Sequence, residues 1–166
     1  MKSELFETFR IIFPELRNYE EPGDLSDLEE LYDWLNTEVS NIQQIDIANY
    51  RDNGIDECDQ LNNRHHVDIE ALKSKIELDI RSYYQRYKEG DEEQDLDHMY
   101  SNDEQFTLDA ILKNLKDVAE NYNLTLFVIY AEDPYWLLVP TDNELNEQLL
   151  TVFNDIYEDE APMAVI

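Results

Sequence analysis

The chain is poor in basic residues, in glycine and in cysteine, and the last two shortages exclude whole classes of protein. Its single cysteine, Cys58, excludes an intrachain disulfide and favours a reducing compartment. Its three glycines leave no glycine-rich loop of the kind that cradles a nucleotide phosphate. No apolar run approaches the roughly 20 residues that cross a bilayer, and the first residues lack the pattern of a signal peptide. We therefore expect a cytoplasmic protein.

Soft metal ligands are equally scarce, and no CxxC or HExxH motif is present. The soft ligands are Cys58, His65, His66 and His98. Two acidic segments, 52–59 and 91–97, offer oxygen ligands, but neither has the glycine and the bidentate glutamate at the offsets of an EF-hand loop. Weak, non-specific binding of cations at these segments stays open. We expect no dedicated metal site and no cofactor.

The sequence also gives no positive support for an enzyme. No serine stands in the turn that exposes a catalytic nucleophile, and carboxylates are too abundant for any pair to be singled out as acid and base. Cys58 lies among Asp56, Glu57 and Asp59, whose charges raise the pKa of its thiol and make it a poor nucleophile. We expect a non-catalytic protein.

Leu124–Pro140 is the only long run rich in aromatic and β-branched residues with a turn signal in its middle. Pro134 suits a turn and would interrupt a ladder of hydrogen bonds, so the two apolar halves are predicted to fold back on each other around 132–135. A hairpin alone is not stable in water. Helices must therefore cover it.

Apolar residues at helical spacing predict about five helices, and three of these have clear end signals. Pro14 should end the first near Phe13, Asp24 or Ser26 should cap the second, and Asp142 or Asn143 should cap the last. The predicted helices cover residues 3–18, 24–39, 67–88, 105–123 and 142–156.

Two acidic stretches separate these helices. In 41–63, the isoleucines near residue 45 are compatible with a short strand or a helical turn, and 52–59 is expected to be an exposed acidic loop. Residues 89–104 carry eight acidic residues and no lysine or arginine, which predicts either a flexible linker or an acidic loop that becomes ordered on binding. The apolar tail 161–166 is compatible with an edge strand, with a contact in a homodimer, or with neither.

These elements predict one acidic domain over residues 1–166. Its class is α+β: mostly helical, with a C-terminal antiparallel β-hairpin covered by helices.

Charge is the quantity that departs furthest from the ordinary. Forty acidic residues face twelve basic ones, for a formal net charge of −28. Solubility needs a magnitude of only about 2–8 in a small domain, so the excess suggests a use. Adaptation to high salt is an alternative explanation. Such a surface repels nucleic acid and anionic lipid, and it attracts basic proteins with association rates that fall as salt rises.

The clearest acidic surface is predicted on the second helix, where Asp27, Glu30 and Asp33 lie opposite the apolar stripe. An ordinary exposed helix pairs glutamate with lysine three or four positions away, whereas this one has no basic residue. Acidic residues at that spacing lie about 5–6 Å apart, which approximates a row of phosphates. The predicted contacts with a partner are Asp27, Glu30, Asp33, Asp52, Asp56, Glu57, Asp59, Asp91, Glu92, Glu93, Asp95 and Asp97.

Tyrosines beside acidic residues reinforce this prediction, because tyrosine at an acidic rim can anchor an interface. They are Tyr19, Tyr32, Tyr50, Tyr100 and Tyr157.

In charge alone, and in no motif, the composition resembles that of the DNA-mimic inhibitors made by phages and mobile elements. The resemblance implies a protein that occludes the DNA- or RNA-binding surface of a basic partner, such as a restriction enzyme or a CRISPR nuclease. One alternative is an immunity protein or antitoxin that neutralises a basic nuclease toxin. Another is a chaperone of basic proteins.

Overall fold

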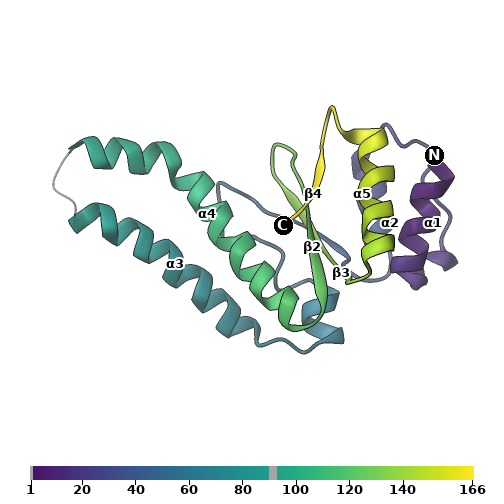
Figure 1. Ribbon diagram of the computed structural model, residues 1–166, viewed down its shortest axis with the longest axis horizontal. Helices are drawn as coiled ribbons and strands as arrows, with labels where there is room; N and C mark the ends of the chain where they lie inside the picture. Colours follow the sequence, from purple (N-terminus) through teal and green to yellow (C-terminus); the bar gives the residue numbers. More distant parts are fainter. Residues whose placement is uncertain (1, 90–92) are drawn as a thin grey trace.

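The computed structural model describes the backbone of residues 2–89 and 93–166, and the side chains of these residues except 87–102 (Figure 1). Helices cover both faces of a small antiparallel sheet, which confirms the predicted α+β class. The elements in chain order are α1 (Lys2–Ile12), the 3₁₀ helix η1 (Pro14–Asn18), α2 (Leu28–Leu35), β1 (Ile42–Gln44), the π-helical turn η2 (Gln60–Arg64), α3 (Ile69–Glu89), α4 (Glu93–Asn121), β2 (Leu124–Ile129), β3 (Tyr135–Pro140), α5 (Asn143–Tyr157) and β4 (Met163–Val165).

The predicted hairpin forms the centre of the sheet. Strands β2 and β3 pair antiparallel with Leu126 opposite Leu138, and the turn between them contains Pro134, as predicted. The strand order is β1-β3-β2-β4. The apolar tail pairs with β2 as strand β4, so of its three predicted fates the edge strand is confirmed.

Both faces of the hairpin are buried, because its side chains alternate between two cores. Phe127 and Leu137 belong to the core formed with α1, α2 and α5, whereas Val128 and Trp136 belong to the core formed with α3, α4 and the segment around Ile55. Figure 1 shows the sheet between these two groups of helices. This double burial explains why the sequence of each strand is a continuous apolar run rather than an alternation of apolar and polar residues.

The first predicted helix ends where its proline requires. Helix α1 stops at Ile12, and Pro14 opens η1, because proline is tolerated in the first turn of a helix and not in its interior. The cap of α2 differs from the prediction. Asp27, and neither Asp24 nor Ser26, is the N-cap, and its carboxylate accepts a hydrogen bond of 2.9 Å from the backbone N–H of Glu29.

The acidic stretch 89–104 is helical over its described part, so the prediction of a loop there was wrong. Glu89 is the last residue of α3, and α4 begins at Glu93, twelve residues before the predicted start at Gln105. No proline or glycine interrupts 93–121, and acidic residues near a helix N-terminus interact favourably with its dipole. Helices α3 and α4 therefore form a long hairpin that extends away from the sheet (Figure 1).

The segment 41–63 contains β1 and is more deeply buried than predicted. Asn53, Ile55 and Cys58 are buried, and the backbone carbonyl of Asn53 accepts a hydrogen bond of 2.8 Å from the indole of Trp136. Gly54 adopts a φ of +78°, and a Cβ atom at this position would lie 2.4 Å from the side chain of Gln43. The turn thus requires glycine, and it tucks the segment against the sheet.

Asparagine side chains close the outer edges of the sheet. At one edge, the amide of Asn154 in α5 both accepts from the backbone N–H of Met163 (2.8 Å) and donates to its carbonyl (2.9 Å). At the other edge, Asn36 makes the same two hydrogen bonds, each of 3.0 Å, with Ile42. Each amide takes the place of a neighbouring strand at one residue and so hinders pairing with another chain there.

We expect Asn154→Ala to lower the free energy of unfolding by about 1–3 kcal/mol, because it leaves the outward N–H and C=O of Met163 without partners. Urea denaturation of this variant and of the control Gln148→Ala, an exposed residue of the same helix, measures the difference. Equal stability of the two variants would contradict the role of Asn154.

Candidate partner-binding site

Helix α2 separates an apolar face from an acidic one. Leu31, Trp34 and Leu35 are buried in the core, whereas Glu29, Glu30 and Asp33 are exposed. The separation follows from the helical period, since residues three and four apart lie on the same face. The core thus holds the helix in place while its carboxylates point to solvent.

The carboxylates of α2 have no cationic partner. Among the residues whose side chains the structure describes, no ion pair includes Asp27, Glu29, Glu30 or Asp33. The described ion pairs involve other acidic residues: Arg10, for example, pairs with Glu7 and Glu21. The acidic face of α2 is therefore a concentration of negative charge that the described part of the protein does not neutralise.

A concave surface, here named the α2 groove, lies between this face and strand β1. Its volume is about 300 Å³, and one wall is a stacked pair of rings, Tyr32 and Tyr135, with centroids 4.1 Å apart. The groove thus combines carboxylates from one helix with an aromatic wall completed by β3. The residues that line it are Glu29, Tyr32, Asp33, Asn36, Ile42, Gln44 and Tyr135.

Negative charge from two separate segments converges on Tyr135. Its pKa is raised above the ordinary value, first by burial and then by the carboxylates of Glu29, Asp133 and Asp33. Asp133 belongs to the turn between β2 and β3, about one hundred residues along the chain from α2. The fold therefore assembles an acidic site that the helix alone does not provide.

The predicted contacts in 52–59 have different environments. Asp52, Asp56 and Glu57 are exposed, and Asp56 forms an ion pair with Lys73 of α3. The side chain of Asp59 is only 6% exposed and pairs with Arg64 at 2.7 Å. The expectation of an exposed loop was thus wrong at Asp59, because its carboxylate is part of the internal structure.

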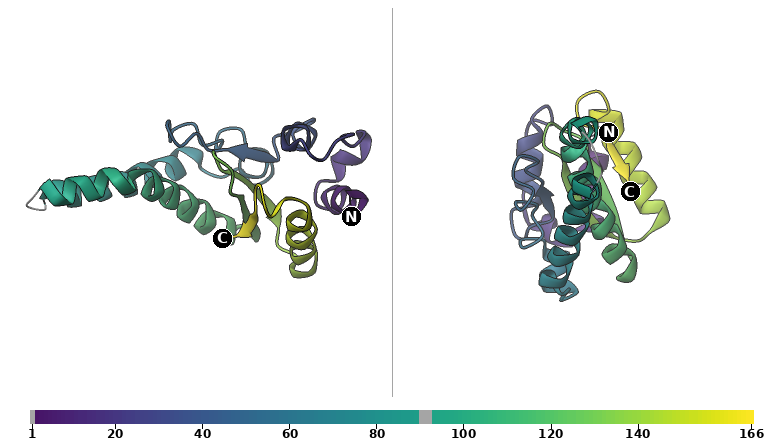
Figure 2. Two further views of the ribbon diagram at one scale, coloured as in Figure 1. Left: turned by 90° about the horizontal axis from the view of Figure 1, so that it is seen from above. Right: turned by 90° about the vertical axis from the view of Figure 1, so that its left-hand side faces the viewer.

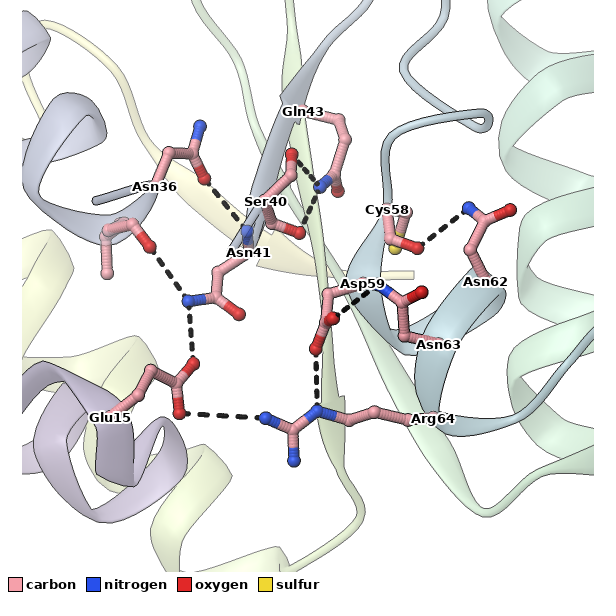
Figure 3. A network of polar contacts seen from close by, with 11 residues as sticks. Glu15, Asn36, Ser40, Asn41, Gln43, Cys58, Asp59, Asn62, Asn63 and Arg64 are labelled. Atoms are coloured by element: carbon pink, nitrogen blue, oxygen red, sulfur yellow. Dashed lines mark hydrogen bonds and ion pairs between the residues drawn. The ribbon is translucent and has the colours of Figure 1, made fainter. Parts of the chain in front are cut away.

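Asp59 is the centre of the polar network in Figure 3. It accepts a hydrogen bond of 2.9 Å from the side chain of Asn63, and Arg64 extends from it to the carboxylate of Glu15 at 3.6 Å. The Asp59 carboxylate raises the pKa of the Arg64 guanidinium. Glu15 in turn accepts a hydrogen bond from Asn41, so this network connects η1, η2 and the start of β1.

The last group of predicted contacts lies far from α2. Glu93, Asp95 and Asp97 belong to the first turns of α4, at the tip of the α3–α4 hairpin, whereas Asp91 and Glu92 lie outside the described residues. Figure 1 and the left view of Figure 2 place this tip and α2 at opposite ends of the molecule. The predicted contacts therefore do not form one continuous track, and α2 carries the best-defined group.

Neither metal binding nor thiol chemistry finds support among the described residues. No three histidine, cysteine or carboxylate side chains in that part of the chain converge as metal ligands would. Burial is the main cause that raises the pKa of the Cys58 thiol to about 12, and the charge of Asp59 contributes less. The acidic neighbours expected from the sequence are thus the smaller cause of the raised pKa.

Comparisons of the chain with family models, with curated proteins and with solved structures found no significant match. In the described part of the chain, no helix combines the length and the apolar character that a membrane span needs.

Sequence reasoning found the acidic face of α2 and noted Tyr32 beside it, but it missed most of the groove. The missed residues include Tyr135, Asn36 and Gln44, together with Asp133 beside them. A signal existed for Tyr135, which directly follows the acidic turn of the hairpin. Nothing in the sequence indicated that Tyr135 lies next to α2.

We expect Arg64→Met to lower the free energy of unfolding by about 1–3 kcal/mol, because it leaves the buried Asp59 carboxylate without its charged partner. Thermal or urea denaturation measures the loss. Arg17→Met is the matched control, since Arg17 is exposed and makes no ion pair with any described residue. Its substitution changes the net charge by the same amount. A loss of the same size in both variants would mean that charge alone, and not this pair, is responsible.

Stability should also fall at alkaline pH. Burial raises the pKa of Cys58 to about 12 from 9.0, and that of Tyr157 to about 12 from 10.0. At a pH between the ordinary and the raised pKa of either group, the unfolded chain has lost a proton that the folded chain still binds. The free energy of unfolding therefore decreases by up to about 1.4 kcal/mol per pH unit for each group. Urea denaturation from neutral pH upward should show an earlier onset of this decrease in the wild type than in Cys58→Val. Identical profiles would contradict the assignment to Cys58.

Proposed function

We propose that this protein is a non-catalytic acidic inhibitor, which occupies the nucleic-acid-binding surface of a basic partner such as a restriction enzyme or a CRISPR nuclease. The observation that carries the proposal is the acidic face of α2, whose carboxylates have no cation partner among the described residues and stand on a helix fixed by the core. A surface that binds phosphates with lysine and arginine also binds fixed carboxylates.

The spacing on α2 supports competition with a nucleic-acid strand. Glu29 and Asp33 are one helical turn apart, or about 6 Å along the axis. Successive phosphates of one DNA strand are separated by about 3.4 Å along the axis of the duplex, so the spacing of the two carboxylates is of the same order. Because α2 has only eight residues, it imitates a short section of backbone. The net charge of −28 adds long-range attraction to the basic partner.

An immunity protein or antitoxin is the second candidate function. The shape of the α2 groove favours it, because a groove with an aromatic wall recognises a particular side chain rather than charge in general. Both functions require a basic partner protein. Displacement by generic DNA distinguishes the two functions. DNA displaces a mimic, because both compete for one surface of the partner, whereas it does not displace an immunity protein that binds its toxin outside the DNA-binding surface.

The proposal is tested with the variant Glu29→Gln/Glu30→Gln/Asp33→Asn, which removes three charges from α2 and retains the cap Asp27. The matched control Glu147→Gln/Asp155→Asn/Asp159→Asn removes three exposed charges from α5 and the turn after it. Capture of basic proteins from a host lysate identifies the partner, and titration gives the affinity. We expect the α2 variant to bind at least about tenfold more weakly than the control, equivalent to about 1.4 kcal/mol.

Two further observations belong to the same experiment. Binding should weaken at high salt, and duplex DNA should displace the inhibitor from its partner. Equal affinities of the α2 variant and the α5 control would refute α2 as the contact surface. Capture that duplex DNA leaves intact would refute mimicry and favour the immunity function.

A further inference from the structure

The α2 groove has the features of a receptor for a flat cation. Tyr135, whose ring stacks on that of Tyr32, lines the groove together with Glu29 and Asp33 from successive turns of α2. An arginine side chain is planar, stacks on aromatic rings and donates hydrogen bonds to carboxylates in a fixed fork. The groove thus offers both kinds of contact that a guanidinium makes.

One residue that lines the α2 groove carries a buried polar group without a hydrogen-bond partner among the described residues. Tyr32, which lines the groove, is only 7% exposed, yet its hydroxyl has no hydrogen-bond partner among the described residues. Buried polar groups are almost always hydrogen-bonded, so this buried hydroxyl is an acceptor beside the groove that no described group satisfies. A guanidinium has five donors and no acceptor.

The edge of the sheet supplies a further acceptor. Alternate residues of an antiparallel edge strand direct their backbone groups outwards, and in β1 these residues are Ile42 and Gln44. Asn36 closes the edge at Ile42, but no described residue does so at Gln44, which lines the groove. The backbone carbonyl of Gln44 is therefore open to a donor from outside.

We propose that the α2 groove binds one arginine side chain of the partner, with the guanidinium against the ring of Tyr135 and its donors toward Glu29 and Asp33. This inference rests on the proposed function and deepens it, because it names the partner residue that the acidic surface selects. General attraction between opposite charges brings the two proteins together. The α2 groove then discriminates arginine from lysine, because the ammonium of lysine is a compact, strongly hydrated charge that neither stacks flat on a ring nor donates in a fixed fork.

The probes for this inference are two blocked tripeptides, acetyl-Gly-Arg-Gly-amide and acetyl-Gly-Lys-Gly-amide, titrated into the full-length protein. Changes in the amide NMR signals report where each peptide binds. We expect the arginine peptide to shift Gln44 and Tyr135, and to bind about twofold to fivefold more tightly than the lysine peptide.

Two variants and one control locate the site. Tyr135→Leu keeps an apolar side chain and removes the aromatic face, so it should weaken arginine binding about twofold to fivefold and abolish the preference over lysine. Glu29→Gln/Asp33→Asn should weaken binding of both peptides. The control Glu147→Gln/Asp155→Asn, with the same change in net charge, should bind both peptides as the wild type does. The amide spectra also verify that each variant is folded.

Equal binding of the two peptides, or arginine binding that neither α2-groove variant weakens, would overturn the inference. Such a result leaves the proposed function standing, because charge alone can still direct the acidic face to a basic partner. Failure of the proposed function is seen separately, as partner capture that survives neutralisation of Glu29, Glu30 and Asp33.

Discussion

Burial of the β2–β3 hairpin on both faces is the interaction on which the rest of the structure depends. A net charge of −28 creates repulsion that opposes a compact chain, and apolar burial must offset it. The two strands supply this burial twice, once against α1, α2 and α5 and once against α3 and α4. The apolar stripe of each helix packs against the sheet or against a neighbouring helix, so the carboxylates on its other face can stay in water.

The described ion pairs all lie outside the acidic face of α2. Lys73 of α3 pairs with Asp56, and Arg64 joins Asp59 to Glu15. No basic residue follows Lys116 in the chain, so the hairpin turn and α5 add only acid to the side of the sheet that α2 covers.

The acidic surface and the groove act at different ranges in the proposed mechanism. Net charge attracts any basic protein over about a Debye length and does so less at high salt. The groove acts only in contact, where an aromatic wall and the carboxylates along it can select one side chain. A protein with both properties combines rapid association with specific recognition, as an inhibitor of one enzyme requires.

The sequence by itself determined the strands around Pro134, the end of α1 before Pro14 and the acidic face of α2, because turn residues and periodicity act over a few positions. Helix α4 begins earlier than predicted, because the charge density of 89–104 suggests a loop although nothing in 93–104 breaks a helix. Only the tertiary structure decided that Asp59 is buried against Arg64 and that Tyr135 stacks on Tyr32 of α2. Tyr32 and Tyr135 are about one hundred residues apart in the chain. Asp59 and Arg64 are close in sequence, but the burial of their pair depends on how the segment 41–63 packs rather than on any local pattern.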